Sequence, residues 1–318
     1  MKNIYVDELN AGRRIDQFLA DHFNDISRNQ LSKIITDGEV LINDKTTKPS
    51  QKVQVDDKIT IREIKIKAGF KAPKGEKIKL DIIYEDDDVI VINKSAGMVV
   101  HPADGNKSGT LVNALINHYR KIVDAIYDED SEISRRRPGI VHRLDKDTSG
   151  VMIIAKNKVA LDFLSNEIQS RQVEKYYCAI CLDNFTNRSG EIRNLLIRHP
   201  KERKQMTVSK NEKGKEAITK YKVKKSYKYI NQNISLVEFQ ILTGRTHQIR
   251  VHSNCQNSPV LGDKVYNTKA SLKLSSELNI ARPLLHSHKL KITLPSGENR
   301  TFSAEMPKDF NEIMDKIS

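Results

Sequence analysis

The sequence predicts an α+β fold in a chain of 318 residues. Runs typical of β-strands recur along most of the chain, with fewer helical stretches between them and no regular strand–helix alternation. This length is more typical of two domains than of one. The lysine-rich segment KIKAGFKAPKGEKIK, residues 65–79, contains glycine and proline as a flexible basic linker does. We therefore expect one domain at residues 1–64 and a second at residues 80–318.

The first domain is expected to contain two helices followed by short strands. In RRIDQFLADHF, residues 13–23, apolar side chains recur at helical spacing. Ser27 is placed to cap a second helix that ends at Gly38. EVLIN and KVQVDDKITI then alternate or run apolar, as short strands do. The polar faces of this domain carry Arg13, Arg14, Arg28, Lys33 and Lys45.

The second domain is expected to combine strands with a few helices. Strands are predicted at residues 89–92, 151–155, 176–180, 219–224 and 234–242. Helices are predicted at residues 109–120 and 159–170, and from about residue 246. A final hairpin is predicted to turn at Pro295-Ser296-Gly297.

The charge of the chain indicates a polyanionic partner. The formal net charge is +13 and the pI is about 9.4. Residues 198–228 hold twelve basic and three acidic residues, and a second cluster joins Arg135-Arg136-Arg137 to Arg143. A solvated surface would explain one such run, but two favour nucleic acid, whose phosphates bind Lys and Arg with release of counterions.

Other features argue against a membrane or secreted protein. The sequence has no apolar run of the length that a membrane-spanning helix needs, and its first residues, MKNIYVDELN, lack a secretion signal. Three cysteines without a framework of pairs are typical of a reducing compartment. We therefore expect a cytoplasmic protein.

Metal and redox sites are not expected. Cys178 and Cys181 have the spacing of a metal knuckle, but the sequence has no second pair, and strand alternation would place the two on opposite faces. The paired histidines lack acidic partners at suitable spacing, so we expect core packing or RNA contacts for His247, His252, His286 and His288.

The segment GIVHRLDKDTSG, residues 139–150, combines a histidine, an arginine, a lysine and two aspartates within twelve residues, and it has three possible interpretations. An EF-hand calcium loop would use Asp145, Asp147 and Ser149, but its twelfth position is Lys156, a cation. An aspartyl phosphatase would need a buried apolar strand directly before the aspartate, where this chain has His142-Arg143. The segment has neither pattern in full.

The third interpretation makes Asp145 a lone catalytic carboxylate on a turn between strands. The neighbouring Arg143 and Lys146 would bind phosphate or keep the carboxylate ionised. The alternative is that Asp145 only caps the turn, which is common in sequences of this kind. These residues alone leave both possibilities open.

The longer segment RPGIVHRLDKDTSGVMIIAK resembles the central motif of the RluA/RluD family of pseudouridine synthases. Further pieces occur in the order of that family over roughly residues 80–290, namely VINKSAGMVVHP, EKYYCAI, LTGRTHQIRVH and PVLGDKVY. The first domain resembles the small RNA-binding domain of the fourth small-subunit ribosomal protein, an arrangement found in RluD-like members. The resemblance implies a mixed, mainly antiparallel catalytic sheet with a central cleft.

The resemblance also implies three catalytic residues. Asp145 would be the nucleophile or general base acting on a flipped uridine, Tyr177 would stack on the uracil, and Arg250 would pair with Asp145. Without the flanking motifs, a core tyrosine and a surface arginine would be the ordinary interpretations. We expect RNA contacts from Arg13, Arg28, Lys33, His142, Arg143, Lys146 and Arg245.

The reaction that the resemblance implies breaks a glycosidic bond and rejoins the same sugar to carbon five of the base. No outside atom enters, so no cofactor or metal is expected. The expected substrate is large-subunit (23S) ribosomal RNA, and the expected state is a monomer. The alternatives are a transfer RNA substrate or a catalytically silent RNA-binding module.

Two departures from the family pattern stand out. Ser95 replaces the proline of N-K-P-A-G, which predicts a looser turn. A polar stretch at residues 253–258 replaces apolar residues after HQIRVH, which puts local helix packing and target choice in question. Neither departure removes a predicted catalytic group.

Overall fold

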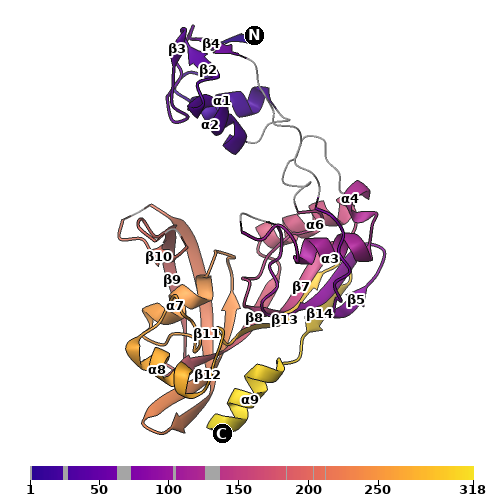
Figure 1. The fold of residues 1–318 in the computed structure, drawn as a ribbon, viewed down its shortest axis with the longest axis vertical. Coiled ribbons are helices and arrows are strands. Elements are labelled where there is room, and N and C mark those ends of the chain that lie inside the picture. The colour runs from indigo at the N-terminus through magenta and orange to yellow at the C-terminus, as the bar shows by residue number, and fades with distance from the viewer. Residues whose placement is uncertain are drawn as a thin grey trace. The chain divides into compact units, whose positions relative to one another are not determined.

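A computed structural model describes residues 2–23, 28–62, 73–102, 105–125, 137–183, 185–202, 204–211 and 213–318. The chain divides into two compact units (Figure 1). The first contains residues 2–62, and the second contains Lys74–Ala125 and Gly139–Ser318. No helix in the described ranges is both long and apolar enough to cross a membrane.

The first unit packs two helices against a four-stranded antiparallel sheet. The predicted helices are α1 (Ile15–His22) and α2 (Arg28–Thr36), and their apolar faces, including Phe18 and Leu31, are buried with Ile59 of the sheet. The sheet order is β1-β4-β2-β3. Its strands are β1 (Lys2–Tyr5), β2 (Val40–Ile42), β3 (Lys45–Thr46) and β4 (Lys58–Ile61).

Strand β4 is shorter than the sequence predicts. Of the run at residues 52–61, only the last four residues form β4. Asp56 adopts a left-handed backbone with φ 66°, which breaks the extended chain before that strand. The predicted cap, Ser27, lies outside the described residues.

The second unit is built on a mixed, mainly antiparallel sheet of ten strands, as predicted. Its order is β10-β9-β11-β12-β8-β13-β7-β6-β5, with β14 paired to β13. The strands are β5 (Ile82–Glu85), β6 (Val89–Lys94), β7 (Ser149–Ala155), β8 (Glu174–Leu182), β9 (Ser189–Arg198), β10 (Met206–Val208), β11 (Lys215–Tyr229), β12 (Gln232–Ile241), β13 (Leu285–Thr293) and β14 (Asn299–Ser303).

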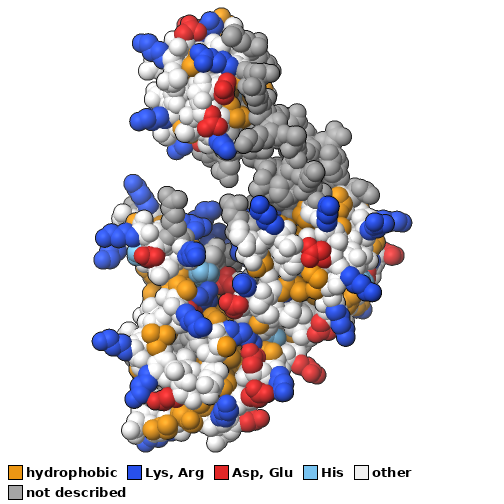
Figure 2. All heavy atoms as spheres, in the orientation of Figure 1, with side chains coloured by type: hydrophobic (Ala, Val, Ile, Leu, Met, Phe, Trp, Pro, Cys, Tyr) orange, Lys and Arg blue, Asp and Glu red, His pale blue; other side chains and the backbone are white. Residues whose placement is uncertain are grey.

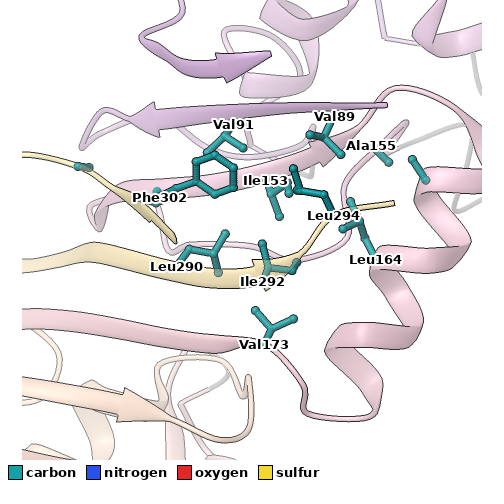
Figure 3. Close-up of a cluster of buried hydrophobic side chains, with 13 residues drawn as sticks. Val89, Val91, Ile153, Ala155, Leu164, Val173, Leu290, Ile292, Leu294 and Phe302 are labelled. Carbon is teal, nitrogen blue, oxygen red and sulfur yellow. The ribbon is translucent and has the colours of Figure 1, made fainter. Parts of the chain in front are cut away.

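Helices border this sheet at both ends of the strand order (Figure 1). They are α3 (Leu111–His118), α4 (Ile122–Ala125), α6 (Lys158–Gln169), α7 (Gln248–Cys255), α8 (Lys269–Glu277) and α9 (Lys308–Ile317). One apolar core lies between α6 and strands β6, β7, β13 and β14 (Figure 3). A second core packs α8 and α9 against β8 and β12. The first core thus packs against the β13-β7-β6 side of the sheet and the second against the β12-β8 side.

One parallel pairing, between β7 and β13, lies at that centre. His286 pairs with Ser149 and Ser287 with Gly150. Gly150 has φ +117°, and a Cβ on it would lie 2.1 Å from the carbonyl oxygen of Ser287, so only glycine fits. The hydroxyl of Ser149 lies 2.9 Å from Nδ1 of His286. These contacts fix the start of β7, directly after the segment that holds Asp145.

The predicted linker, residues 65–79, falls partly outside the described residues. Within its described part, Glu76 accepts a hydrogen bond from the backbone of Gly109 and donates one from its own backbone to Asn113. These contacts belong to the second unit, which begins at Lys74. The predicted boundaries at residues 64 and 80 stay predictions.

Candidate active site

The turn that carries Asp145 is held through its backbone. The amide of Thr148 donates to the carbonyl of Asp145 at 3.1 Å, which closes the turn before β7. The carbonyl of Lys146 accepts from Nζ of Lys94 at 3.1 Å and from the amide of Gly97 at 2.9 Å. The NKSAG segment therefore supports the turn, although Ser95 stands in place of the family's proline.

Lys94 is a buried cation, 1% exposed, without a carboxylate partner in its hydrogen bonds. Its ammonium also donates to the carbonyls of Ser95 and Met98, at 2.8 and 2.9 Å, so all three donors are used. Burial lowers the pKa of Lys94 to about 8, against the opposing influence of Asp147 and Asp145. Lys94 thus places a positive charge beneath the turn.

A second cation holds the next carbonyl of the turn. Arg282 donates to the carbonyl of Asp147 at 3.0 Å. Its other donors form a bidentate pair with Asp309 of α9, at 2.6 and 2.7 Å. Such a pair fixes the plane of a guanidinium. The position of the turn consequently depends on the last helix of the chain.

Arg250 joins the carboxylate of Asp145 to the opposite side of the site. From α7, its NH1 donates to Oδ2 of Asp145 at 3.2 Å. Its Nε and NH2 form a bidentate pair with Asp263, at 2.6 and 2.9 Å. Burial alone would lower the pKa of Arg250, but Asp263 and Asp145 hold it above its ordinary value. Arg250 is therefore a permanent, oriented cation beside Asp145.

Tyr177 lies on β8 and borders the same pocket as Asp145. Its side chain is 6% exposed. Burial raises the pKa of Tyr177 well above its usual value, against the opposing influence of Ser287 on β13. At neutral pH it is therefore a neutral phenol fixed at the pocket wall.

The pocket brings together all three predicted catalytic side chains and two of the predicted RNA-binding arginines. Figure 2 shows Lys and Arg side chains around a hollow in the second unit, with His and acidic side chains inside it. Arg143 is exposed at the pocket, and Arg245 is half-buried with Nε donating to the carbonyl of Glu216 at 2.9 Å. The pocket is lined by Arg143, Leu144, Asp145, Thr148, Tyr177, Ile241, Gly244, Arg245, Thr246, His247, Gln248, Ile249, Arg250 and Leu285.

The other predicted RNA contacts lie elsewhere. His142 accepts from the amide of Ile153 at 3.1 Å, and burial lowers its pKa to about 3, so it is a neutral group bonded to β7. Lys146 and Lys33 are exposed. Arg13, in the first unit, pairs with Asp21 at 2.5 Å. The side chain of Arg28 lies outside the described residues.

Three site residues had no predicted role. Asp263 and Tyr266 belong to PVLGDKVY, and Lys94 belongs to NKSAG. Neither motif by itself predicts the contacts of these side chains. Cys178 and Cys181 are buried, and the described ranges contain no cluster of three His, Cys, Asp or Glu side chains that could bind a metal.

Two family models match parts of this chain. Residues 88–254 match the family model of RNA pseudouridylate synthases, and residues 13–59 match the S4 domain. The Uncharacterized RNA pseudouridine synthase YlyB of Bacillus subtilis is 37% identical over 316 residues, which cover 99% of this chain and 97% of that protein. Ribosomal large subunit pseudouridine synthase D of Escherichia coli strain K12 is 36% identical over 320 residues, covering 98% of this chain and 92% of that protein.

A solved human structure is similar in fold as well. Human RNA Pseudouridylate Synthase Domain Containing 4 aligns with a TM-score of 0.57 at 26% identity, covering 74% of this chain and 92% of the human chain. The family model spans more than half of the sequence, and the relatives match it almost from end to end. The chain therefore belongs to the RNA pseudouridylate synthase family and carries an S4 domain in front of its synthase domain.

Proposed function

We propose that this RNA pseudouridine synthase acts on uridines of large-subunit ribosomal RNA, with Asp145 as the catalytic carboxylate. Relatives named ribosomal large subunit pseudouridine synthase D, 36% identical over 98% of this chain, support the choice of substrate. The observation that carries the role of Asp145 is its contact with Arg250, a guanidinium already fixed by Asp263, at the edge of a pocket. A turn residue without chemistry would not need an oriented cation beside it.

This arrangement suits glycosidic chemistry. When uracil leaves, the ribosyl centre becomes electron-poor, and an ionised carboxylate either attacks that centre or stabilises it. In the alternative route, the carboxylate removes a ribose proton. Both routes need a carboxylate inside the pocket, and the guanidinium of Arg250 lies 3.2 Å from Oδ2 of Asp145. The isomerisation conserves every atom of the nucleotide, so it requires no cofactor.

The pocket wall supports a role for Tyr177 as the surface that receives a flipped base. Enzymes that act on a base inside RNA must take it out of its stack, and an aromatic face can replace the lost stacking. Because Tyr177 stays a neutral phenol at neutral pH, we assign its contribution to the ring and not to a phenolate. Arg143 and Arg245 at the pocket are suited to bind the flanking phosphates.

Chemical mapping of pseudouridine in total RNA tests the proposal. Cells that lack the protein are expected to lose pseudouridine at specific uridines of the large-subunit RNA. Wild type and a control, Asp183→Asn, should restore them, since Asp183 pairs with Arg188 and Ser226 away from the pocket. Asp145→Asn should restore none.

Each other outcome has a definite meaning. Restoration of every site by Asp145→Asn would show that this carboxylate is not catalytic. Loss of sites only in transfer RNA would refute the ribosomal substrate and leave the chemistry intact. An unchanged map in the deletion strain would identify a silent RNA-binding module.

A further inference from the structure

His247 occupies an unusual backbone position next to the catalytic turn. It precedes α7 with φ 56° and ψ 20°, in the left-handed region, and its side chain does not cap the helix. Residues other than glycine are uncommon there, although Asn, Asp and His are enriched among the exceptions. Held strain of this kind clusters at functional sites, so the imidazole itself requires an explanation.

Two contacts connect this imidazole to β10 through Tyr266. The backbone amide of Met206, in β10, donates to the hydroxyl oxygen of Tyr266 at 2.7 Å. That oxygen lies 2.9 Å from Nδ1 of His247. Because the hydroxyl accepts from a backbone N–H, its own proton can be donated to Nδ1. In that arrangement the imidazole proton resides on Nε2.

The other ring nitrogen, Nε2, faces the proposed catalytic carboxylate. It lies 3.8 Å from Oδ2 of Asp145, the same oxygen that Arg250 contacts at 3.2 Å. Within the described residues, no hydrogen bond to Oδ1 of Asp145 is found. Hydrogen bonds in active sites are often long before substrate binds and shorten afterwards, and here a movement of about 1 Å is enough.

We propose that His247 is a positioning residue for uridine isomerisation: as a neutral donor held by Tyr266, it engages Oδ2 of Asp145 and leaves Oδ1 to meet the ribosyl group. The inference rests on the proposed role of Asp145 and adds an orientation to it. It also links β10 to the carboxylate through Met206, Tyr266 and His247.

The charges around the ring agree with a neutral imidazole. Burial is the largest influence and lowers the pKa of His247. Asp145 and Asp263 oppose this effect, whereas Arg250 and Arg143 add to it. Tyr266 also lies against the ring, with 2.9 Å between its hydroxyl oxygen and Nδ1. With Tyr266 as the donor to Nδ1, the ring is a donor at Nε2 and carries no net charge at neutral pH.

The tautomer can be tested without measuring activity. Nitrogen-15 spectra of full-length protein labelled at histidine, with His247 assigned by its absence in His247→Gln, should show a neutral ring protonated at Nε2 at neutral pH. Tyr266→Phe should weaken the preference for that tautomer, whereas Tyr227→Phe, in a distant core, should not. A ring protonated at Nδ1, or at both nitrogens, would overturn the inference.

Kinetics test the consequence for the reaction. His247→Asn suits the left-handed backbone but is too short to reach Asp145, whereas His247→Gln restores an N–H at similar reach. Since a hydrogen bond to a charged group contributes about 1.5–3 kcal/mol, His247→Asn should lower kcat about tenfold to a hundredfold with little change in KM. His247→Gln should recover most of that loss. His118→Gln, at the exposed pair with Glu85, is the control.

These outcomes separate the inference from the proposed function. If Asp145→Asn is inactive but His247→Asn is as active as wild type, the positioning role fails and the catalytic role of Asp145 stands. If Asp145→Asn is active, the proposed function fails, whatever the tautomer. Equal losses in the Asn and Gln variants, with unchanged unfolding midpoints in urea, would also contradict a role as donor.

Discussion

At the scale of single residues, the site is an alternation of charges in which Arg250 lies between two carboxylates. Asp263 takes two donors of the guanidinium and leaves NH1 for Asp145. Tyr266 covers the guanidinium, with 5.1 Å between its ring centre and the guanidinium carbon. The cation is thus desolvated and oriented before any RNA binds, which is the condition under which it acts most strongly on a developing charge.

Asp263→Asn is expected to impair catalysis although Asp263 does not touch the substrate pocket. The amide keeps the shape but loses the charge and one acceptor, so Arg250 can turn away from Asp145. Because charged hydrogen bonds contribute about 1.5–3 kcal/mol, kcat should fall about tenfold to a hundredfold. Single-turnover kinetics measure this, with Asp183→Asn as the control. A variant with full activity would show that Arg250 is oriented without its second carboxylate.

The sequence predicted part of this site. The resemblance placed Asp145, Tyr177 and Arg250, and the structure brings all three to one pocket. It did not reveal the pairing of Asp263 with Arg250, because Arg250 lies within α7 and Asp263 in the loop after that helix, and only the path of the loop brings them together. Nor did it reveal the left-handed backbone of His247, which no local pattern of residue types encodes.

At the scale of elements, the pairing of β7 with β13 controls the geometry of the turn that carries Asp145. Gly150 permits the close approach of the two strands. Ser149, the residue before it, forms a hydrogen bond with His286 of β13. The carbonyls of residues 146 and 147 are then held by Lys94 and Arg282. The turn is thereby fixed at both its carbonyls and its exit into β7.

Gly150→Ala should be strongly destabilising. Its Cβ would lie 2.1 Å from a backbone oxygen of Ser287, which the chain can relieve only by separating the strands. We expect a loss of about 1–3 kcal/mol from overpacking in addition to about 1 kcal/mol from the left-handed backbone. Gly297→Ala, with φ +86° and open space around it, should show the backbone cost alone. Urea denaturation measures both, and equal losses would refute the steric explanation.

The elements differed in how far the sequence could predict them. Strands at residues 89–92 and 151–155 were found because they are buried, continuous apolar runs. Helices α3 and α6 begin where Thr110 and Asn157 cap them. By contrast, β11 extends well beyond the predicted residues 219–224. The lysines on its exposed face make the rest of this strand look polar in the sequence, and the polar β9 is not predicted at all. Their strand pairing comes from neighbours in the sheet and not from local pattern.

At the scale of the whole molecule, we propose that residues 1–64 form a separate RNA-binding domain, joined by residues 65–79 to the synthase domain. Arg13 and Lys33 supply positive charge on the first unit, which has its own apolar core around Phe18 and Ile59. The described cores of the second unit draw no residue from the first. Each unit therefore has the packing that independent folding requires.

Deletion of residues 1–70 should leave the synthase domain folded but weaken its binding to RNA. Each lost contact between a cation and a phosphate also reduces the dependence of affinity on salt. Filter binding of ribosomal RNA fragments over a range of salt concentrations measures both effects, and circular dichroism reports on folding. Unchanged affinity and unchanged choice of uridines at physiological salt would refute the RNA-binding role of this domain.

The parallel pairing of β7 with β13 has a consequence for the order of assembly. Ser149 and its partner His286 are separated by 137 residues, so the chain must close a very long loop before they meet. Contacts of such separation form late and slow the folding of a domain. During synthesis, the Asp145 turn leaves the ribosome long before β13, Arg282 and α9 exist to hold it. The geometry of the proposed catalytic turn is thus among the last features that the newly made chain acquires.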